Sequence, residues 1–133
     1  MRAALPIVHE ARTPAGFDGN GYTVPESWAD GKDGHDDPVD RVVFSWEPEQ
    51  VDVEVQAGYQ MRVSNRQLVM VPDISPFKPN DHVVLGKTVA TVVDDDVRMR
   101  VDEIRDYSHS PVGMISGTFG PAPGVLVVEN VSG

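Results

Sequence analysis

The apolar residues of this chain fall in short runs that proline, glycine and aspartate interrupt. The clearest stretch is 66–93, where the run 68–71 stops at Pro72, the run 83–85 reaches Gly86, and the run 88–93 ends in three aspartates. Short β-branched runs bounded by such residues are typical of strands joined by turns. The stretch therefore predicts a three-stranded meander, with the aspartates in a turn. No segment of the chain shows a convincing amphipathic helical period.

Further strands are expected on both sides of this meander. The residue at 102 breaks the alternation of its strand, which indicates a bulge. About six short strands joined by turns predict an all-β protein, a small antiparallel β-barrel that forms one domain over 1–133. The expected strands outside the meander cover 3–9, 22–24, 41–46, 97–105 and 125–131.

Long connecting segments are the second feature of the pattern. The intervals 10–40 and 107–124 are rich in glycine, proline and polar residues, and we expect them to be long loops. The sequence Asp18-Gly19-Asn20-Gly21 marks a tight turn within the first interval. In the interval 47–65, valines alternate with acidic residues over 51–55, which favours a half-exposed strand or an extended arm.

The charge balance limits the possible partners. The chain has 133 residues, and 21 acidic against 11 basic residues give a net charge of −10. Such a surface repels phosphate backbones and anionic membranes, so neither nucleic-acid nor membrane binding is expected. No apolar run approaches the roughly 20 residues of a membrane span. The first eight residues do not resemble a signal peptide, and we expect a soluble protein.

Residues for catalysis or metal binding do not form a recognisable pattern. The chain lacks cysteine, which excludes disulfides, thiol catalysis and thiolate metal sites. Its four histidines have no metal-motif spacing, and the acidic loop 30–37 departs from the calcium-loop pattern. Ser116 does not stand in a nucleophile elbow. We therefore expect no catalytic, cofactor or metal site, and no enzymatic activity.

Aromatic residues are concentrated in the expected loops. They either cap the open ends of the barrel or form contacts with another protein, because aromatic residues are enriched at interfaces. Both interpretations stay open at this point. The residues are Phe17, Tyr22, Trp28, Phe77, Tyr107 and Phe119.

The order of several short motifs over 41–133 resembles the head-to-tail stopper (head-closure) proteins of long-tailed phages, especially those that infect actinobacteria. The motifs are Trp46-Glu47-Pro48, the strand 68–72 that ends in proline, the turn 77–81 into a hairpin, the pair Asp106-Tyr107, the segment 110–113, and Pro123-Gly124 before the last strand. The chain departs from the family pattern over 1–40, where the usual first hairpin is hard to find, and over 107–124, which is longer than expected.

This resemblance implies a structural protein of the virion neck that is made in the host cytoplasm. It implies a β-barrel that forms a homo-oligomeric ring, with six subunits expected, between the adaptor on the portal side and the tail terminator, with genomic DNA only as channel contents. The loop 47–65 would point into the channel through Glu49, Val51, Asp52, Val53, Glu54, Val55 and Tyr59. Docking turns would present Phe77, Lys78, Tyr107, Val112 and Phe119, and basic contacts would come from Arg62, Arg66, Lys78 and Lys87.

Two alternatives remain beside this interpretation. The first is a tail-completion or tail-tube protein of the same virus class, which would also be a β-barrel with long loops. The second is a small ligand-binding β-domain, for which the sequence offers no convergent set of polar groups.

Overall fold

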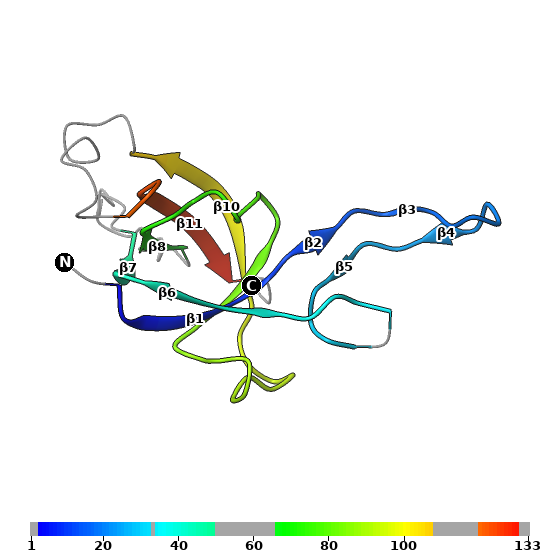
Figure 1. Ribbon diagram of the computed structural model, residues 1–133, viewed down its shortest axis with the longest axis horizontal. Helices are drawn as coiled ribbons and strands as arrows, with labels where there is room; N and C mark the ends of the chain where they lie inside the picture. The colour runs from blue at the N-terminus through cyan, green and yellow to red at the C-terminus, as the bar shows by residue number, and fades with distance from the viewer. Residues whose placement is uncertain (1–2, 33, 50–65, 108–119, 131–133) are drawn as a thin grey trace, which may run out of the picture.

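The main body of the protein is one antiparallel β-sheet of seven strands (Figure 1). The computed structural model describes residues 3–32, 34–49, 66–107 and 120–130, and these residues contain no helix. The strand order is β6-β1-β9-β10-β11-β8-β7. The strands are β1 (Leu5–Glu10), β6 (Val39–Val43), β7 (Ser45–Pro48), β8 (Arg66–Val71), β9 (His82–Leu85), β10 (Met99–Asp106) and β11 (Gly124–Asn130).

The two outermost strands of this sheet are consecutive in the chain. β6 pairs with β1, and β7 pairs with β8, yet only Phe44 separates β6 from β7. The Phe44 amide donates to the carbonyl of Met70 on β8 over 2.9 Å. One continuous segment, 39–48, therefore borders both ends of the sheet.

The core lies on one face of this sheet. Apolar side chains alternate into it along most strands, as expected for strands with one face turned to the interior. β11 is buried from Gly124 to Val128, which fits its place between β10 and β8. The buried cluster consists of Ile7, Val43, Val69, Val71, Phe77, Val83, Met99, Val101, Leu126 and Val128.

The structure confirms an all-β protein with antiparallel pairing and corrects the meander expected over 66–93. β8 pairs with β7 and β11, whereas β9 pairs with β1 and β10. The expected third strand, 88–93, is a series of turns, because the Thr88 amide donates to the Thr91 hydroxyl and the Thr91 amide donates back to the Thr88 carbonyl. Threonine side chains that bond to the nearby backbone compete with a strand ladder in this way.

Other expectations hold in the described residues. β1, β10 and β11 lie where the sequence predicts strands, and the aspartates at 94–96 lie in a turn. The register of β10 against β11 shifts between Val101 and Glu103, at the bulge expected near Asp102. The strand expected over 41–46 is divided at Phe44 into β6 and β7.

The interval 10–40, expected to be a loop, contains a hairpin that leaves the sheet after β1 (Figure 1). We call residues 11–29 the arm. The arm consists of two short ladders, β2 (Arg12–Thr13) with β5 (Ser27–Trp28) and β3 (Gly16–Phe17) with β4 (Thr23–Val24). β4 lies within the strand expected over 22–24. The other three strands of the arm were not predicted, because each ladder has only two residue pairs and prolines lie between the ladders on both sides, so the alternation that marks a strand is too short to recognise.

The turn at the tip of the arm closes as its residues predict. The Asp18 carboxylate accepts from the amides of Asn20 and Tyr22 over 2.9 Å each, and Gly21 has a φ of 83°. An aspartate that binds amides two residues on, followed by glycine with positive φ, is a common turn chemistry.

Gly124 offers a direct test of this packing. A Cβ at this position would lie 2.3 Å from the Arg105 carbonyl oxygen and 2.6 Å from Ile74 Cγ2. We expect Gly124→Ala to lower the free energy of unfolding by about 2 kcal/mol, as forced overpacking does. The matched control is Gly16→Ala in the arm, where nothing lies within 4 Å. Urea denaturation should leave the control within about 0.5 kcal/mol of the parent, and equal losses in the two variants would contradict the fold.

Candidate functional site

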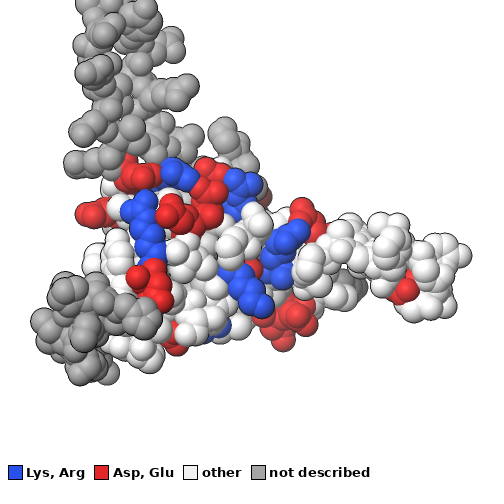
Figure 2. Space-filling view, turned by 90° about the horizontal axis from the view of Figure 1, so that it is seen from above, with Lys and Arg blue, Asp and Glu red and all other residues white. Residues whose placement is uncertain are grey.

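The tip of the arm carries the most exposed aromatic side chains of the described residues. Phe17 is 79% exposed, Tyr22 is 72% exposed and Val24 is 44% exposed. Figure 2 shows the arm as a narrow projection with little charge on it, and Asp18 is the one charged residue between positions 13 and 25. Exposed aromatic groups on a projecting element are typical of a protein contact rather than of a core.

The root of the arm is fixed by a buried carboxylate, Asp81, which is 2% exposed. Its Oδ2 accepts from His9 Nε2 over 2.8 Å and from the Lys78 amide over 3.0 Å, and its Oδ1 accepts from the Arg12 amide over 2.9 Å. His9 lies on β1, and Arg12 lies on β2 at the root of the arm. The carboxylate thus joins strand, arm and the turn before β9, and we call this set the Asp81 centre.

The ring of His9 continues this network on its other side. Its Nδ1 accepts from Arg41 Nε over 2.9 Å, so Nε2 carries the proton that it donates to Asp81. Burial lowers the pKa of His9, the bond to Asp81 and its charge oppose this effect, and the charge of Arg41 adds to it. The centres of the Phe77 and His9 rings lie 4.6 Å apart. The Arg41 guanidinium lies over the Phe77 ring, 5.5 Å from the centre of that ring.

A second contact fixes the return strand of the arm. The Trp28 ring stacks on His82 with 4.1 Å between ring centres and 4° between planes, and Trp28 Nε1 donates to the Asn80 carbonyl over 2.8 Å. Burial, followed by the positive charge of Arg98, lowers the pKa of His82 to about 4. Because β5 and β9 are joined in this way, both strands of the arm are attached to the sheet at its root.

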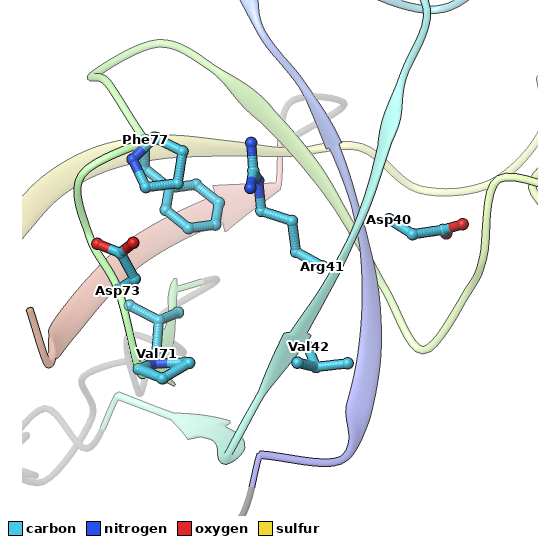
Figure 3. A pocket seen from close by; sticks show the side chains of 8 residues that line it. Asp40, Arg41, Val42, Val71, Asp73 and Phe77 are labelled. Carbon is cyan, nitrogen blue, oxygen red and sulfur yellow. The ribbon is translucent and has the colours of Figure 1, made fainter. Parts of the chain in front are cut away.

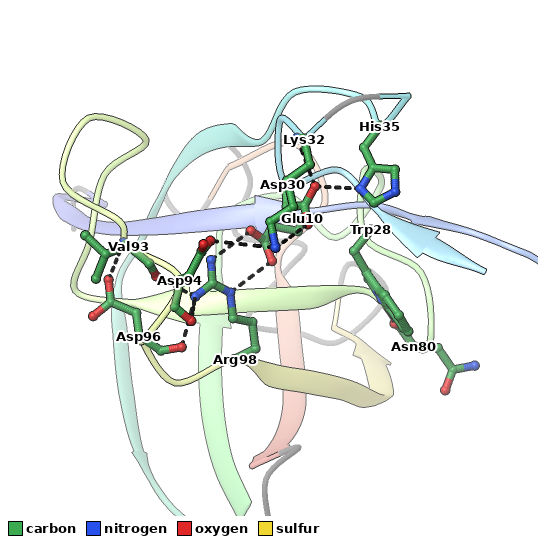
Figure 4. Close-up of polar contacts among 10 residues, drawn as sticks. All are labelled: Glu10, Trp28, Asp30, Lys32, His35, Asn80, Val93, Asp94, Asp96 and Arg98. Carbon is green, nitrogen blue, oxygen red and sulfur yellow. Dashed lines mark hydrogen bonds and ion pairs between the residues drawn. The ribbon is translucent and has the colours of Figure 1, made fainter. Parts of the chain in front are cut away.

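The loops beside the root are joined through Arg98 and Lys32 (Figure 4). The Arg98 guanidinium lies 3.3 Å from both carboxylate oxygens of the buried Glu10. Its Nη1 also donates to the carbonyls of Val93 and Asp96 over 2.7 and 2.9 Å. Lys32 lies 3.7 Å from Asp30 and 3.8 Å from Asp94, so the acidic loop after the arm faces the turn that holds the aspartates.

A hollow of about 310 Å³ opens between β6 and the segment after β8 (Figure 3). In this view Arg41 and Phe77 point towards one another across it, while Asp40 points away on the far side of β6. We call it the β6 hollow. Its lining is mostly apolar and consists of Asp40, Arg41, Val42, Val71, Pro72, Asp73, Pro76 and Phe77.

Of the seven residues expected to point into the channel, one lies in the described part of the chain. Glu47 and Pro48, at the start of the expected loop 47–65, belong instead to β7. The Glu49 amide donates to the Arg66 carbonyl over 3.0 Å, which extends the β7–β8 ladder, and its Oε2 lies 3.6 Å from Arg66 Nη1. The remaining candidates lie outside the described residues: Val51, Asp52, Val53, Glu54, Val55 and Tyr59.

The candidate docking residues differ in their exposure: Phe77 is buried, whereas Lys78 and Tyr107 are exposed. Phe77 was expected on an exposed turn but is 5% exposed, because the turn folds it under Arg41 and against His9. Lys78 next to it is exposed, and so is Tyr107, whose amide donates to Pro123. Val112 and Phe119 lie outside the described residues.

Two of the four basic candidates, Arg66 and Lys87, have acidic neighbours. Arg66 pairs with Asp102 and lies 3.9 Å from Glu129, while Lys87 lies 3.7 Å from Asp96. Arg62 is outside the described residues. Arg66 and Lys87 therefore form ion pairs within the chain and are not positioned for a partner protein alone.

Two absences apply to the part of the chain that the structure describes. No group of three or more metal-ligating side chains gathers there. It also contains no helix that could cross a membrane.

Removal of the central carboxylate should loosen both sheet and arm. Asp81→Ala would leave a buried histidine and two amides without their acceptor, and we expect a loss of at least about 3 kcal/mol of unfolding free energy. The control is Asp95→Ala, in the exposed turn, with a change within about 0.5 kcal/mol. Urea denaturation measures both, and a stability of Asp81→Ala close to that of the control would contradict the role of the Asp81 centre.

Acid should destabilise the protein before most carboxylates titrate. His9 and His82 have lowered pKa values in the folded state, so below the unfolded value of about 6.5 the unfolded chain binds more protons. The free energy of unfolding is therefore full above about pH 6.5 and falls as the pH is lowered towards about 5, by at most about 1.4 kcal/mol per pH unit for each histidine. Urea denaturation across this range should show the loss, with a shallower slope for His82→Gln. A flat profile in the parent would contradict the described environment of both rings.

No family model, curated protein or solved structure matches this chain. The geometry of the arm, the Asp81 centre and the β6 hollow is therefore what supports a function.

Proposed function

We propose that this chain is a structural subunit of a phage head–tail connector, a head-closure protein that acts in the virion neck and has no enzymatic activity. Copies of the chain form a ring that joins the adaptor on the portal side to the tail terminator and closes the exit channel for DNA. Subunits are made in the host cytoplasm and assemble there. The order of motifs that resembles the head-closure family supplies the class of function, and the geometry supports a contact protein.

The observation that carries this proposal is the aromatic arm. A projecting hairpin with Phe17 and Tyr22 exposed is costly for a soluble monomer, because apolar surface in water favours association. The Asp81 centre and the Trp28–His82 stack hold its root against the sheet. A fixed root reduces the conformational entropy lost on binding, which is the usual advantage of a preorganised contact element.

The sheet supports a barrel as the rigid part of such a subunit. Segment 39–48 pairs with β1 through β6 and with β8 through β7, so it connects the two ends of the sheet. We propose that the sheet curls into a small barrel that closes along this segment. Closure at the β7–β8 ladder covers one end of the sheet, and in the described residues the outer edge of β6 stays unpaired.

The roots of the two proposed contact elements lie apart. The arm leaves the sheet after β1, whereas the candidate channel loop begins and ends at the β7–β8 ladder, where Glu49 bonds to Arg66 (Figure 1). β7 and β8 lie towards the end of the molecule opposite the arm. Contact elements at two ends suit a subunit that meets its surroundings in an assembly at more than one place.

The charge of the chain is compatible with a channel for DNA. A net charge of −10 repels a duplex, so DNA can pass acidic walls without being bound. This argument concerns the whole chain and does not assign particular wall residues.

Interruption of the gene by a stop codon in its phage tests the proposed class. Infection of a non-suppressing host should yield filled heads that lose DNA and separate, complete tails, as seen by electron microscopy. A suppressing host is the control and should restore joined particles. Normal infectious virions without the protein would overturn the proposal, and so would short or absent tails, which would indicate a tail-tube role.

The arm can be tested separately from the fold. We expect Phe17→Ser with Tyr22→Ser to leave the melting temperature within about 2 °C, because substitutions of exposed residues change stability little. The same double variant should fail to restore joined particles in the complementation assay. Val93→Ser, at an exposed valine outside the arm, is the control and should restore them fully. Full restoration by the arm variant would contradict a contact role for the arm.

A further inference from the structure

One edge of β6 is left without a partner strand in the described residues. Leu5, Ile7 and His9 of β1 face Val43, Arg41 and Val39 in register, and the Ala4 amide donates to the Val43 carbonyl. Along an antiparallel pair the backbone groups of successive residues point to opposite sides. The groups of Asp40 and Val42 therefore point away from β1, and no strand pairs with them there.

The β6 hollow lies beside this free edge. Val42 is 51% exposed, and Val71, Pro72, Pro76 and Phe77 supply the rest of an apolar lining. An unpaired strand edge next to an apolar hollow is the arrangement to which an extended segment adds, with backbone bonds for affinity and a side-chain pocket for specificity.

The charges of the β6 hollow select among possible occupants. Among the described residues, its lining has one cation, Arg41, and two carboxylates, Asp40 and Asp73. Each carboxylate already accepts from a backbone amide of its own chain, whereas only Nε of Arg41 is used, by His9, and its two terminal nitrogens have no hydrogen-bond partner there. An occupant with apolar side chains and one carboxylate placed at Arg41 would use these free donors. The arm tip has this chemistry, since Phe17, Tyr22 and Val24 surround one acidic residue, Asp18.

The arm tip also has the backbone that such an edge requires. Among the residues that the structure describes, β3 and β4 pair only with each other, so both have free outer edges there. The low charge of the tip matters as well, because two copies of a chain with a net charge of −10 repel each other except where the contact is nearly uncharged.

We propose that the arm tip of one copy, residues 16–24, docks into the β6 hollow of a second copy. Phe17 fills the apolar lining, Asp18 approaches Arg41, and a tip strand lies along the free edge of β6. The two surfaces are different, so the contact is heterologous and repeats from copy to copy, which produces a ring when the rotation closes. That the repeated contact produces a ring rests on the proposed function. The contact itself can be tested with the purified chain alone.

Engineered disulfides test this contact, because the chain has no cysteine of its own. Phe17→Cys protein is mixed with Val42→Cys protein under mild oxidation, and the mixed disulfide is measured by mass spectrometry. The control mixture replaces the second protein by Val93→Cys, at a similarly exposed valine outside the β6 hollow. We expect the disulfide between the cysteines at positions 17 and 42 to form at least about tenfold faster than the disulfide in the control mixture, because a docked pair has a raised effective concentration.

Self-association gives a second, independent measurement. Sedimentation velocity of the parent over a concentration series should show growth to larger species, which Phe17→Ser and Val42→Asp each weaken at least about tenfold through the lost burial or the introduced charge. Val93→Asp should associate as the parent does. Equal disulfide rates in the two mixtures, or a parent that stays monomeric at all concentrations without the mixed disulfide, would overturn the inference.

The results also separate this inference from the proposed function. If the disulfide forms but loss of the gene leaves virions normal, the contact stands and the connector function fails. If loss of the gene leaves heads and tails unjoined but the disulfide between positions 17 and 42 forms no faster than its control, the function stands and this contact fails. A Val42→Asp defect in complementation without any effect on self-association would identify another protein as the occupant and would overturn the inference.

Discussion

The carboxylate of Asp81 is the contact on which the arrangement of this protein depends. A buried carboxylate is tolerated only when its oxygens are satisfied, and here the satisfying groups come from β1, from the start of the arm and from the turn at 78. The backbone carbonyl of Asp81 also accepts from the Val101 amide of β10 over 2.8 Å. The requirement of one charged group thus sets the positions of elements that are far apart in the chain.

The direction of the arm follows from this constraint. Arg12 cannot leave Asp81 without leaving a buried acceptor unsatisfied, and Trp28 cannot leave His82 without exposing the stack and the Asn80 carbonyl. In the described part of the chain, the outer half of the arm has no such contacts with the sheet, and its aromatic residues are exposed. The molecule therefore combines a fixed root with an unsatisfied tip, a combination that favours binding to another chain with little reorganisation.

The sequence predicts the parts of this structure that depend on neighbours along the chain. β10 with its bulge, β11, the turn at 94–96 and the tip turn at 18–21 are all indicated by local alternation or by turn residues. The run 88–93 misleads because its threonines bond to their own backbone, which composition alone does not reveal.

What depends on distant residues could not be predicted. His9 and Asp81 are 72 positions apart, and neither has a motif that marks it as a partner of the other. Phe77 looks exposed between two prolines, but the Asp81 centre folds its turn inward. The β6 hollow arises only when the segment after β8 comes to face β6, and no local pattern predicts that approach.

Hydrogen exchange measured by mass spectrometry, on the isolated chain at low concentration and on the self-associated chain at high concentration, tests the central claim that a fixed root presents a free tip for contact. The amides of Arg12 and Lys78, which bond to Asp81, should exchange slowly in both states. The amides of residues 16–24 should exchange quickly in the isolated chain and become protected on assembly. Rapid exchange at Arg12 and Lys78 in the isolated chain, or equal exchange of the tip in the two states, would contradict the account.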